Sequence, residues 1–86
     1  MYESLVDQVA VVTGAGAGIG RAIAQRFARA GCRVVVNDVD SATAEETAAE
    51  LRASGRVAIG VGADVSNGEQ VAAMFDTVEA EFGTVD

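Results

Sequence analysis

The chain has 86 residues, so we expect one small domain at most. Half of the residues are hydrophobic and 22% are charged, which indicates a folded globular protein rather than a disordered one. The formal net charge of −7 argues against nucleic acid and against an anionic membrane surface as partners, because both attract basic patches.

The first predicted strand covers residues 9–12, a short apolar run of valine and alanine. A glycine-rich turn follows this strand, and a helical pattern begins at once. Its apolar side chains recur at the spacing of an amphipathic helix, and Gly31 is placed to end it. The face that we expect to be buried contains Ile19, Ile23, Phe27 and Ala30.

The same order is repeated twice along the rest of the chain. A strand at residues 34–36 precedes a helix from about residue 42 to residue 54, with Asp40 or Ser41 as its N-cap. A strand at residues 57–61 precedes a third helix, which opens with Ser66 and Glu69 at the spacing of a capping box. The expected buried stripe of the third helix contains Val71, Met74, Phe75, Val78 and Phe82.

Three strand–helix units in succession predict an α/β fold: a Rossmann-type doubly wound parallel sheet, truncated after three units. We expect the strand order 3-2-1, in which the first strand is the innermost strand of the complete fold. No fourth strand is present to pair with its other side, and open apolar edges associate. We therefore expect self-association, another chain or a missing segment to cover residues 9–12.

The glycine-rich turn has the pattern Gly14-x-x-x-Gly18-x-Gly20. Gly14 permits a sharp exit from the strand, Gly18 permits close approach of a pyrophosphate, and Gly20 permits tight packing of the helix on the sheet. The N–H groups of Ala17 and Ile19 are candidate donors to phosphate oxygens at the helix N-terminus. The alternative is a flexible turn with incidental glycines. A P-loop is excluded, because the chain has no lysine.

Asp38 ends the second predicted strand, 18 residues after Gly20. A carboxylate at this distance typically accepts hydrogen bonds from the adenosine ribose hydroxyls of a dinucleotide, and it repels the 2′-phosphate of NADP. Neither Ala17 nor Val39 supplies a positive charge for that phosphate, so we expect NAD rather than NADP. Val39 would then flank one face of the adenine. The alternative is that Asp38 only starts a turn before the helix cap at Asp40.

Four segments of the chain resemble the short-chain dehydrogenase/reductase family: residues 13–20, 36–38, 63–65 and 82–86. The resemblance implies that Asp64 binds the adenine amino group and that the backbone of Val65 pairs with the ring. From the residues alone, Asp64 is equally well explained as a loop residue before the third helix.

In this family an Asn-Asn-Ala-Gly segment follows the matched region, and a serine and a Tyr-x-x-x-Lys pair then carry out proton transfer. The chain reaches Asp86 before all of them, has no lysine or histidine, and contains Tyr2 as its only tyrosine. We therefore expect no catalytic residues in residues 1–86 and no activity from this chain alone. The resemblance implies the N-terminal, NAD-binding part of an oxidoreductase that moves a hydride between nicotinamide and a carbonyl or alcohol substrate, with the catalytic half absent.

Two other functions stay open. One is a non-catalytic module that binds a nucleotide, or that binds a partner strand at its open edge. The other is a flavin-binding domain, which the glycine spacing disfavours. The small-molecule substrate would be bound only by a longer parent protein.

The expected location is the cytoplasm. Cys32 is the only cysteine, so a disulfide framework and paired cysteine metal ligands are excluded, and we expect no metal. The N-terminus lacks the basic and apolar regions of a signal peptide, and no apolar stretch approaches the length of a membrane-spanning helix.

Overall fold

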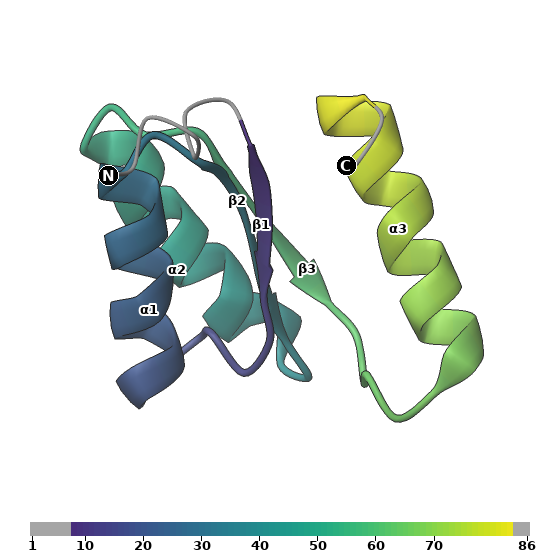
Figure 1. Ribbon diagram of the computed structural model, residues 1–86. Coiled ribbons are helices and arrows are strands. Elements are labelled where there is room, and N and C mark those ends of the chain that lie inside the picture. Colours follow the sequence, from purple (N-terminus) through teal and green to yellow (C-terminus); the bar gives the residue numbers. More distant parts are fainter. Residues whose placement is uncertain (1–7, 84–86) are drawn as a thin grey trace.

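The computed structural model describes residues 8–83, so the expectations for Tyr2 and residues 84–86 lie outside the described residues. Strands and helices alternate along the chain, as Figure 1 shows. The elements are β1 (Val9–Val12), α1 (Gly18–Arg29), β2 (Arg33–Asp38), α2 (Ser41–Ala53), β3 (Ala58–Gly62) and α3 (Gly68–Phe82). The three predicted units are therefore present, with boundaries within two residues of the predicted ones for the strands.

The strands form one parallel sheet with β2 in the middle, in the order β1-β2-β3. This is the predicted order. Val11 pairs with Val35, and Val35 pairs with Ile59, so the register is continuous across the sheet. Within residues 8–83, β1 pairs with β2 alone and its other edge has no strand partner.

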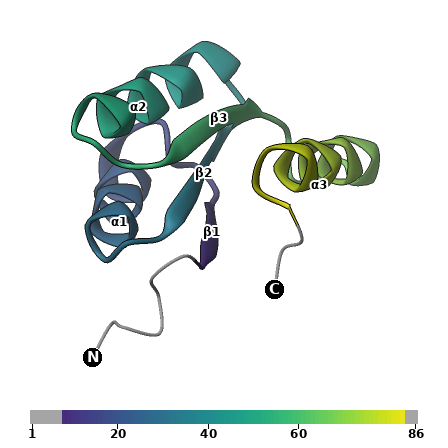
Figure 2. The ribbon, with the colours of Figure 1, turned by 90° about the horizontal axis from the view of Figure 1, so that it is seen from above.

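The helices lie in two layers. Helices α1 and α2 cover one face of the sheet and α3 lies on the other, as the view from above shows (Figure 2). Successive residues of β2 alternate between these layers. Val34 and Val36 join the core cluster beneath α1 and α2, whereas Val35 joins the cluster that contains Met74 and Val78 of α3.

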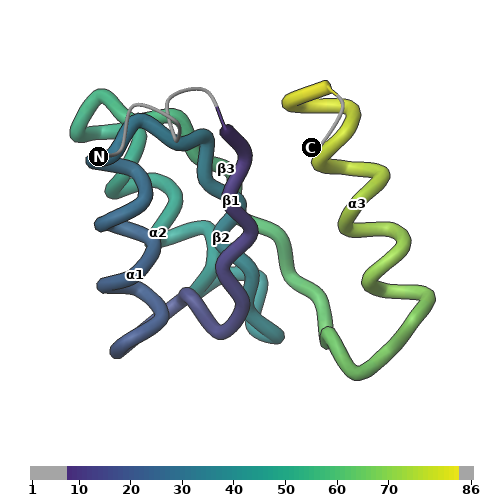
Figure 3. The backbone as a smooth tube through the Cα atoms, in the orientation of Figure 1, coloured from purple at the N-terminus to yellow at the C-terminus, as the bar shows by residue number. Residues whose placement is uncertain are grey.

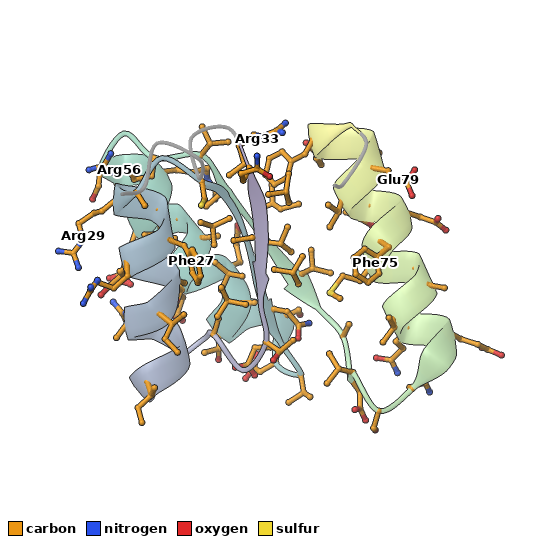
Figure 4. The ribbon with its side chains drawn as sticks, viewed as in Figure 1. Phe27, Arg29, Arg33, Arg56, Phe75 and Glu79 are labelled. Atoms are coloured by element: carbon orange, nitrogen blue, oxygen red, sulfur yellow. The ribbon has the colours of Figure 1, made fainter. Side chains whose placement is uncertain are left out.

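The buried face of α1 differs from the predicted one. Ala24 and Ala28 are the buried residues of α1, whereas Ile19 and Ile23 are exposed. Helix α1 approaches the sheet so closely that alanine side chains fill the interface, and Phe27 packs at its border (Figure 4). The larger side chains are thereby displaced toward solvent.

Helix α3 begins one residue later than the capping box predicted. Asn67 is the N-cap, and its Oδ1 accepts a hydrogen bond of 3.1 Å from the N–H of Gln70. Ser66 was the wrong cap, because its hydroxyl donates instead to Asp64 Oδ1. The predicted buried stripe of α3 is confirmed at Met74 and Val78, which are buried. The prediction was wrong at Phe75, which is exposed.

The end of α3 is fastened to the start of β2 by Arg33. Its Nη1 donates to the carbonyl oxygen of Phe82 at 2.7 Å, and its guanidinium lies 5.5 Å from the centre of the Phe82 ring. Figure 4 shows Arg33 at the amino edge of the sheet, next to the last turn of α3. The contact combines a charge-assisted hydrogen bond with a cation–π interaction.

Candidate functional site

The connections that follow the three strands lie along one edge of the sheet. Because the strands are parallel, their carboxyl ends meet there, and the tube trace follows each chain segment to the lower edge before its helix begins (Figure 3). In doubly wound sheets ligands bind outside this edge. The predicted site residues therefore lie along this edge of the sheet: those of the turn after β1, and Asp38, Val39, Asp64 and Val65.

Two glycines of the turn between β1 and α1 have backbone angles that favour glycine. Gly14 has φ +63° and Gly18 has φ +62°, and a Cβ added to either would meet no atom within 4 Å. The space beside Gly18 is therefore open. Gly20 differs, because its added Cβ would collide with the backbone of Gly14 and Ala15. Gly20 allows the first turn of α1 to rest directly on the glycine-rich turn.

The N-terminus of α1 has no side-chain cap. Its N-cap residue is Ala17, and no acidic residue lies in its first turn. The other two described helices do have such caps, Asp40 on α2 and Asn67 on α3. The positive end of the α1 dipole is therefore left for an anion from outside the described chain.

The N–H groups of the turn divide into two sets. Ala15 donates to the carbonyl oxygen of Asn37 at 2.8 Å, and Gly16 donates to Asp38 Oδ2 at 3.1 Å. The next three N–H groups, of Ala17, Gly18 and Ile19, have no hydrogen-bond partner among residues 8–83. The first set fixes the turn to β2, and the second set is available to donate hydrogen bonds to a ligand oxygen.

Asp38 connects two of the loops at this edge. Its Oδ2 accepts from Gly16, and its Oδ1 accepts from the N–H of Asp40 at 3.1 Å. A carboxylate offers about four lone-pair sites, so two backbone bonds leave acceptor capacity for further hydroxyl donors. The side chain is half-buried and its position is defined by both bonds.

Asp64 lies in the loop between β3 and α3. Its Oδ1 accepts from the N–H of Ser66 at 2.9 Å and from the Ser66 hydroxyl at 2.7 Å. These hydrogen bonds stabilise the charged form and lower the pKa of the Asp64 carboxyl. The N–H of Asp64 is held by Gln70 Oε1 at 2.8 Å, so the loop is tied to the first turn of α3.

Large apolar side chains are exposed in the first turn of α1 and in each of the two later connections. Ile19 is 82% exposed, Val39 73% and Val65 50%. Exposed apolar side chains that share one edge of a domain are typical of a site that receives an apolar ring or another surface. They supply apolar contact area at the same edge as the polar groups of the turn and Asp38.

Three residues with structural roles at this edge were missed by the sequence analysis. Asn37 is buried, and its Nδ2 donates to the carbonyl oxygens of Val61 and Ala63, which joins the ends of β2 and β3. Gly16 and Thr47 hydrogen-bond to each other across the α1–α2 layer. The sequence does carry a signal for Asn37, because a polar residue directly after an apolar strand indicates a side chain that hydrogen-bonds at the end of the sheet.

Arg21 lies in the first turn of α1, next to the glycine-rich turn. Its guanidinium pairs with the carboxylate of Glu50 on α2.

In the part of the chain that the structure describes, no cluster of His, Cys, Asp or Glu is suited to bind a metal ion. None of the helices in residues 8–83 has the length and apolarity needed to cross a membrane.

The family model for short chain dehydrogenases matches residues 8–86. The chain belongs to the short-chain dehydrogenase/reductase family. The resemblance and the Rossmann-type fold predicted from the sequence are thereby confirmed.

Curated relatives and solved structures agree with this assignment. The probable oxidoreductase EphD of Mycobacterium tuberculosis is 48% identical over 80 residues, which cover 93% of this chain and 14% of that protein. Glucose 1-dehydrogenase 2 of Bacillus subtilis is 44% identical over 87 residues, covering 100% of this chain and 34% of that protein.

Among solved structures, the hydroxysteroid dehydrogenase from Escherichia coli superposes with a TM-score of 0.90 and 36% identity, over 95% of this chain and 35% of that chain. The 3-ketoacyl-(acyl-carrier-protein) reductase from Brucella melitensis, complexed with NADH, gives 0.86 and 43%, over 95% of this chain and 32% of that chain. The chain thus spans about a third of the length of these structures.

Proposed function

We propose that residues 1–86 form the NAD-binding N-terminal part of a short-chain oxidoreductase. The uncapped N-terminus of α1 carries this proposal, because the free N–H groups of Ala17, Gly18 and Ile19 offer hydrogen bonds and a positive dipole end to a diphosphate. The open space beside Gly18 gives the diphosphate room to approach. When bound, the dinucleotide supplies the hydride chemistry.

The other predicted site residues contact the adenosine part of the cofactor or shape the glycine-rich turn. Asp38 accepts hydrogen bonds from the adenosine ribose, because its carboxylate can accept more than the two bonds from the N–H groups of Gly16 and Asp40. Val39 flanks the adenine with its exposed side chain, and the backbone of Val65 pairs with the ring. Asp64 accepts from the adenine amino group through the oxygen that Ser66 does not occupy. Gly14 and Gly20 hold the shape of the turn.

The same edge supports NAD over NADP. A 2′-phosphate on the ribose would lie next to the Asp38 carboxylate, and Arg21, the arginine in the first turn of α1, is already paired with Glu50. Arg29, Arg33 and Arg56 lie toward the opposite edge of the sheet in Figure 4. Arg26 lies in the last turn of α1, and Arg52 is paired with Glu45. Within residues 8–83, no arginine is therefore placed beside Asp38 to neutralise the additional phosphate.

Calorimetric titration of the purified protein with NAD and NADP tests both statements. We expect NAD to bind at least about tenfold more tightly, a difference of about 1.4 kcal/mol. Equal affinities, or tighter NADP binding, would contradict the proposed role of Asp38. Absence of binding of either dinucleotide would contradict the proposed function.

The hydride transfer is proposed for a longer protein. Residues 1–86 contain no histidine or lysine, and we propose that the residues that transfer protons and bind the carbonyl or alcohol substrate lie beyond this segment. The free edge of β1 supports the same proposal, because a further strand of the domain, or a second chain, would complete the sheet. The coding sequence after residue 86 tests it: an in-frame stop and a stable, soluble product would favour the non-catalytic strand-binding module instead.

We further infer a cytoplasmic location. The chain has one cysteine, the buried Cys32, and a single cysteine cannot form a disulfide within the chain, as expected for a protein of a reducing compartment. Burial also raises the pKa of its thiol, which keeps Cys32 in the unreactive protonated form.

A further inference from the structure

Gly16, at the centre of the glycine-rich turn, is held on both sides by residues from outside the turn. Its N–H donates to Asp38 Oδ2 at 3.1 Å, and its carbonyl oxygen accepts from Thr47 Oγ1 at 3.0 Å. A Cβ added to Gly16 would lie 2.5 Å from Thr43 Cγ2. Helix α2 therefore packs against this residue and takes part in shaping the turn.

Thr47 lies on the buried face of α2 and is only 1% exposed. A threonine within a helix commonly donates to the carbonyl of its own preceding turn, as Thr77 of α3 does to Ala73 at 3.1 Å. Thr47 instead donates to a carbonyl 31 residues earlier in the chain. This buried hydrogen bond satisfies both groups, and its loss would leave the Gly16 carbonyl without its donor.

The hydrogen bond from Thr47 also fixes the direction of the next N–H group. The peptide bond between Gly16 and Ala17 is trans, as are all described peptide bonds, so its C=O and N–H point in opposite directions. With the carbonyl turned toward buried Thr47, the N–H of Ala17 points away from α2. This N–H has no partner among residues 8–83, and Ala17 is exposed.

We propose that Thr47 is a positioning residue for the diphosphate site. Its hydroxyl locks the Gly16–Ala17 peptide in the orientation that presents the Ala17 N–H to the cofactor, and it does so without touching the cofactor itself. The inference rests on the proposed dinucleotide binding. A peptide released from Thr47 can rotate, and rotation replaces the donor with a carbonyl oxygen that repels phosphate.

The test compares Thr47→Val, which removes the hydroxyl at nearly constant shape, with Thr47→Ser, which keeps it. Thr77→Val is the matched control, because it removes a hydroxyl that bonds only within its own helix. The intact natural protein and each variant are titrated with NAD, ADP and adenosine. We expect Thr47→Val to weaken NAD and ADP binding about tenfold and to leave adenosine binding unchanged, while the serine variant and the control bind as the wild type does.

A second readout needs no ligand. In the cofactor-free protein, the carbonyl carbon resonance of Gly16 and the amide resonance of Ala17 should move further in Thr47→Val than in Thr47→Ser. If the valine variant does not fold, Thr47→Ala takes its place in both measurements. Unchanged ADP affinity in a folded variant without the hydroxyl, or an equal loss for adenosine, would overturn the role of Thr47 alone. A wild-type protein that binds neither NAD nor ADP would overturn the proposed function and this inference with it.

Discussion

Replacing Gly20 with alanine tests the contact that seats α1 on the glycine-rich turn. The added Cβ would lie 2.8 Å from the carbonyl carbon of Gly14 and 3.0 Å from the Cα of Ala15, and closer still to the Gly14 oxygen. All three atoms are backbone, and the turn is itself fixed by the bond from Ala15 to Asn37. The strain can therefore be relieved only by moving α1 away from the turn.

The expected size of the effect follows from two opposing contributions. Overpacking of this kind typically costs about 1–3 kcal/mol of the free energy of unfolding. Alanine is a better helix former than glycine by about 1 kcal/mol in a helix interior, and by less in the first turn, where Gly20 lies. We therefore expect a net loss of about 1–2 kcal/mol.

Gly68→Ala is the matched control. Gly68 is also in the first turn of a helix, but a Cβ added there meets no atom within 4 Å. Urea denaturation followed by circular dichroism should show Gly68→Ala as stable as the wild type or more stable, and Gly20→Ala as less stable. Equal stability of the two variants would refute the close approach of α1 to the turn.

The remaining predictions concern the site. Asp38→Ala should weaken NAD binding and narrow the preference for NAD over NADP, measured by calorimetry; unchanged discrimination would remove Asp38 from the ribose site. Gly18→Val should abolish dinucleotide binding, because a branched side chain is strained at φ +62° and fills the open approach. Retained affinity would argue against a diphosphate site at the glycine-rich turn. Asp40→Ala should lower the melting temperature by removing the cap of α2. Asp40→Asn should lower it much less, because asparagine can also cap a helix.

Asp40 also makes the cap sensitive to pH. Hydrogen bonds from Thr43 and Ala42 lower the pKa of the Asp40 carboxyl below its ordinary value of 3.8. A depressed pKa in the folded state means that the stabilisation is present above the unfolded pKa and is lost as pH falls through the lower, folded value. The advantage of the wild type over Asp40→Asn should therefore be constant near neutral pH and shrink below pH 3.8 in thermal melts. An advantage that persists unchanged into that acid range would contradict this role for the charge.

Much of the fold was predictable because its signals are local. Short valine-rich runs that are buried on both faces indicate parallel strands, and Gly31 and Gly83 lie where the helices before them end. Strand order followed from chain connectivity. The glycine-rich turn was predictable because Gly14 and Gly18 have backbone conformations that favour glycine, and the spacing of these glycines is visible in the sequence.

The details that failed depend on distances between elements. The spacing of apolar residues could not show that α1 would approach the sheet closely enough to bury Ala24 and Ala28 and expose Ile19 and Ile23. Ser66 and Asn67 are both good caps, and the competing bond from Ser66 to Asp64 decided between them. The link from Thr47 to the turn spans 31 residues and has no local signature.

The central claim is that a diphosphate binds at the uncapped N-terminus of α1. Titration of the ¹⁵N-labelled protein with NAD, followed by amide resonances, tests it most directly. We expect the largest shifts at Ala17, Gly18 and Ile19, and smaller changes at Gly16, whose N–H is already bonded to Asp38. If NAD saturates the protein while the amide resonances of Ala17, Gly18 and Ile19 do not shift, the diphosphate does not bind at the N-terminus of α1.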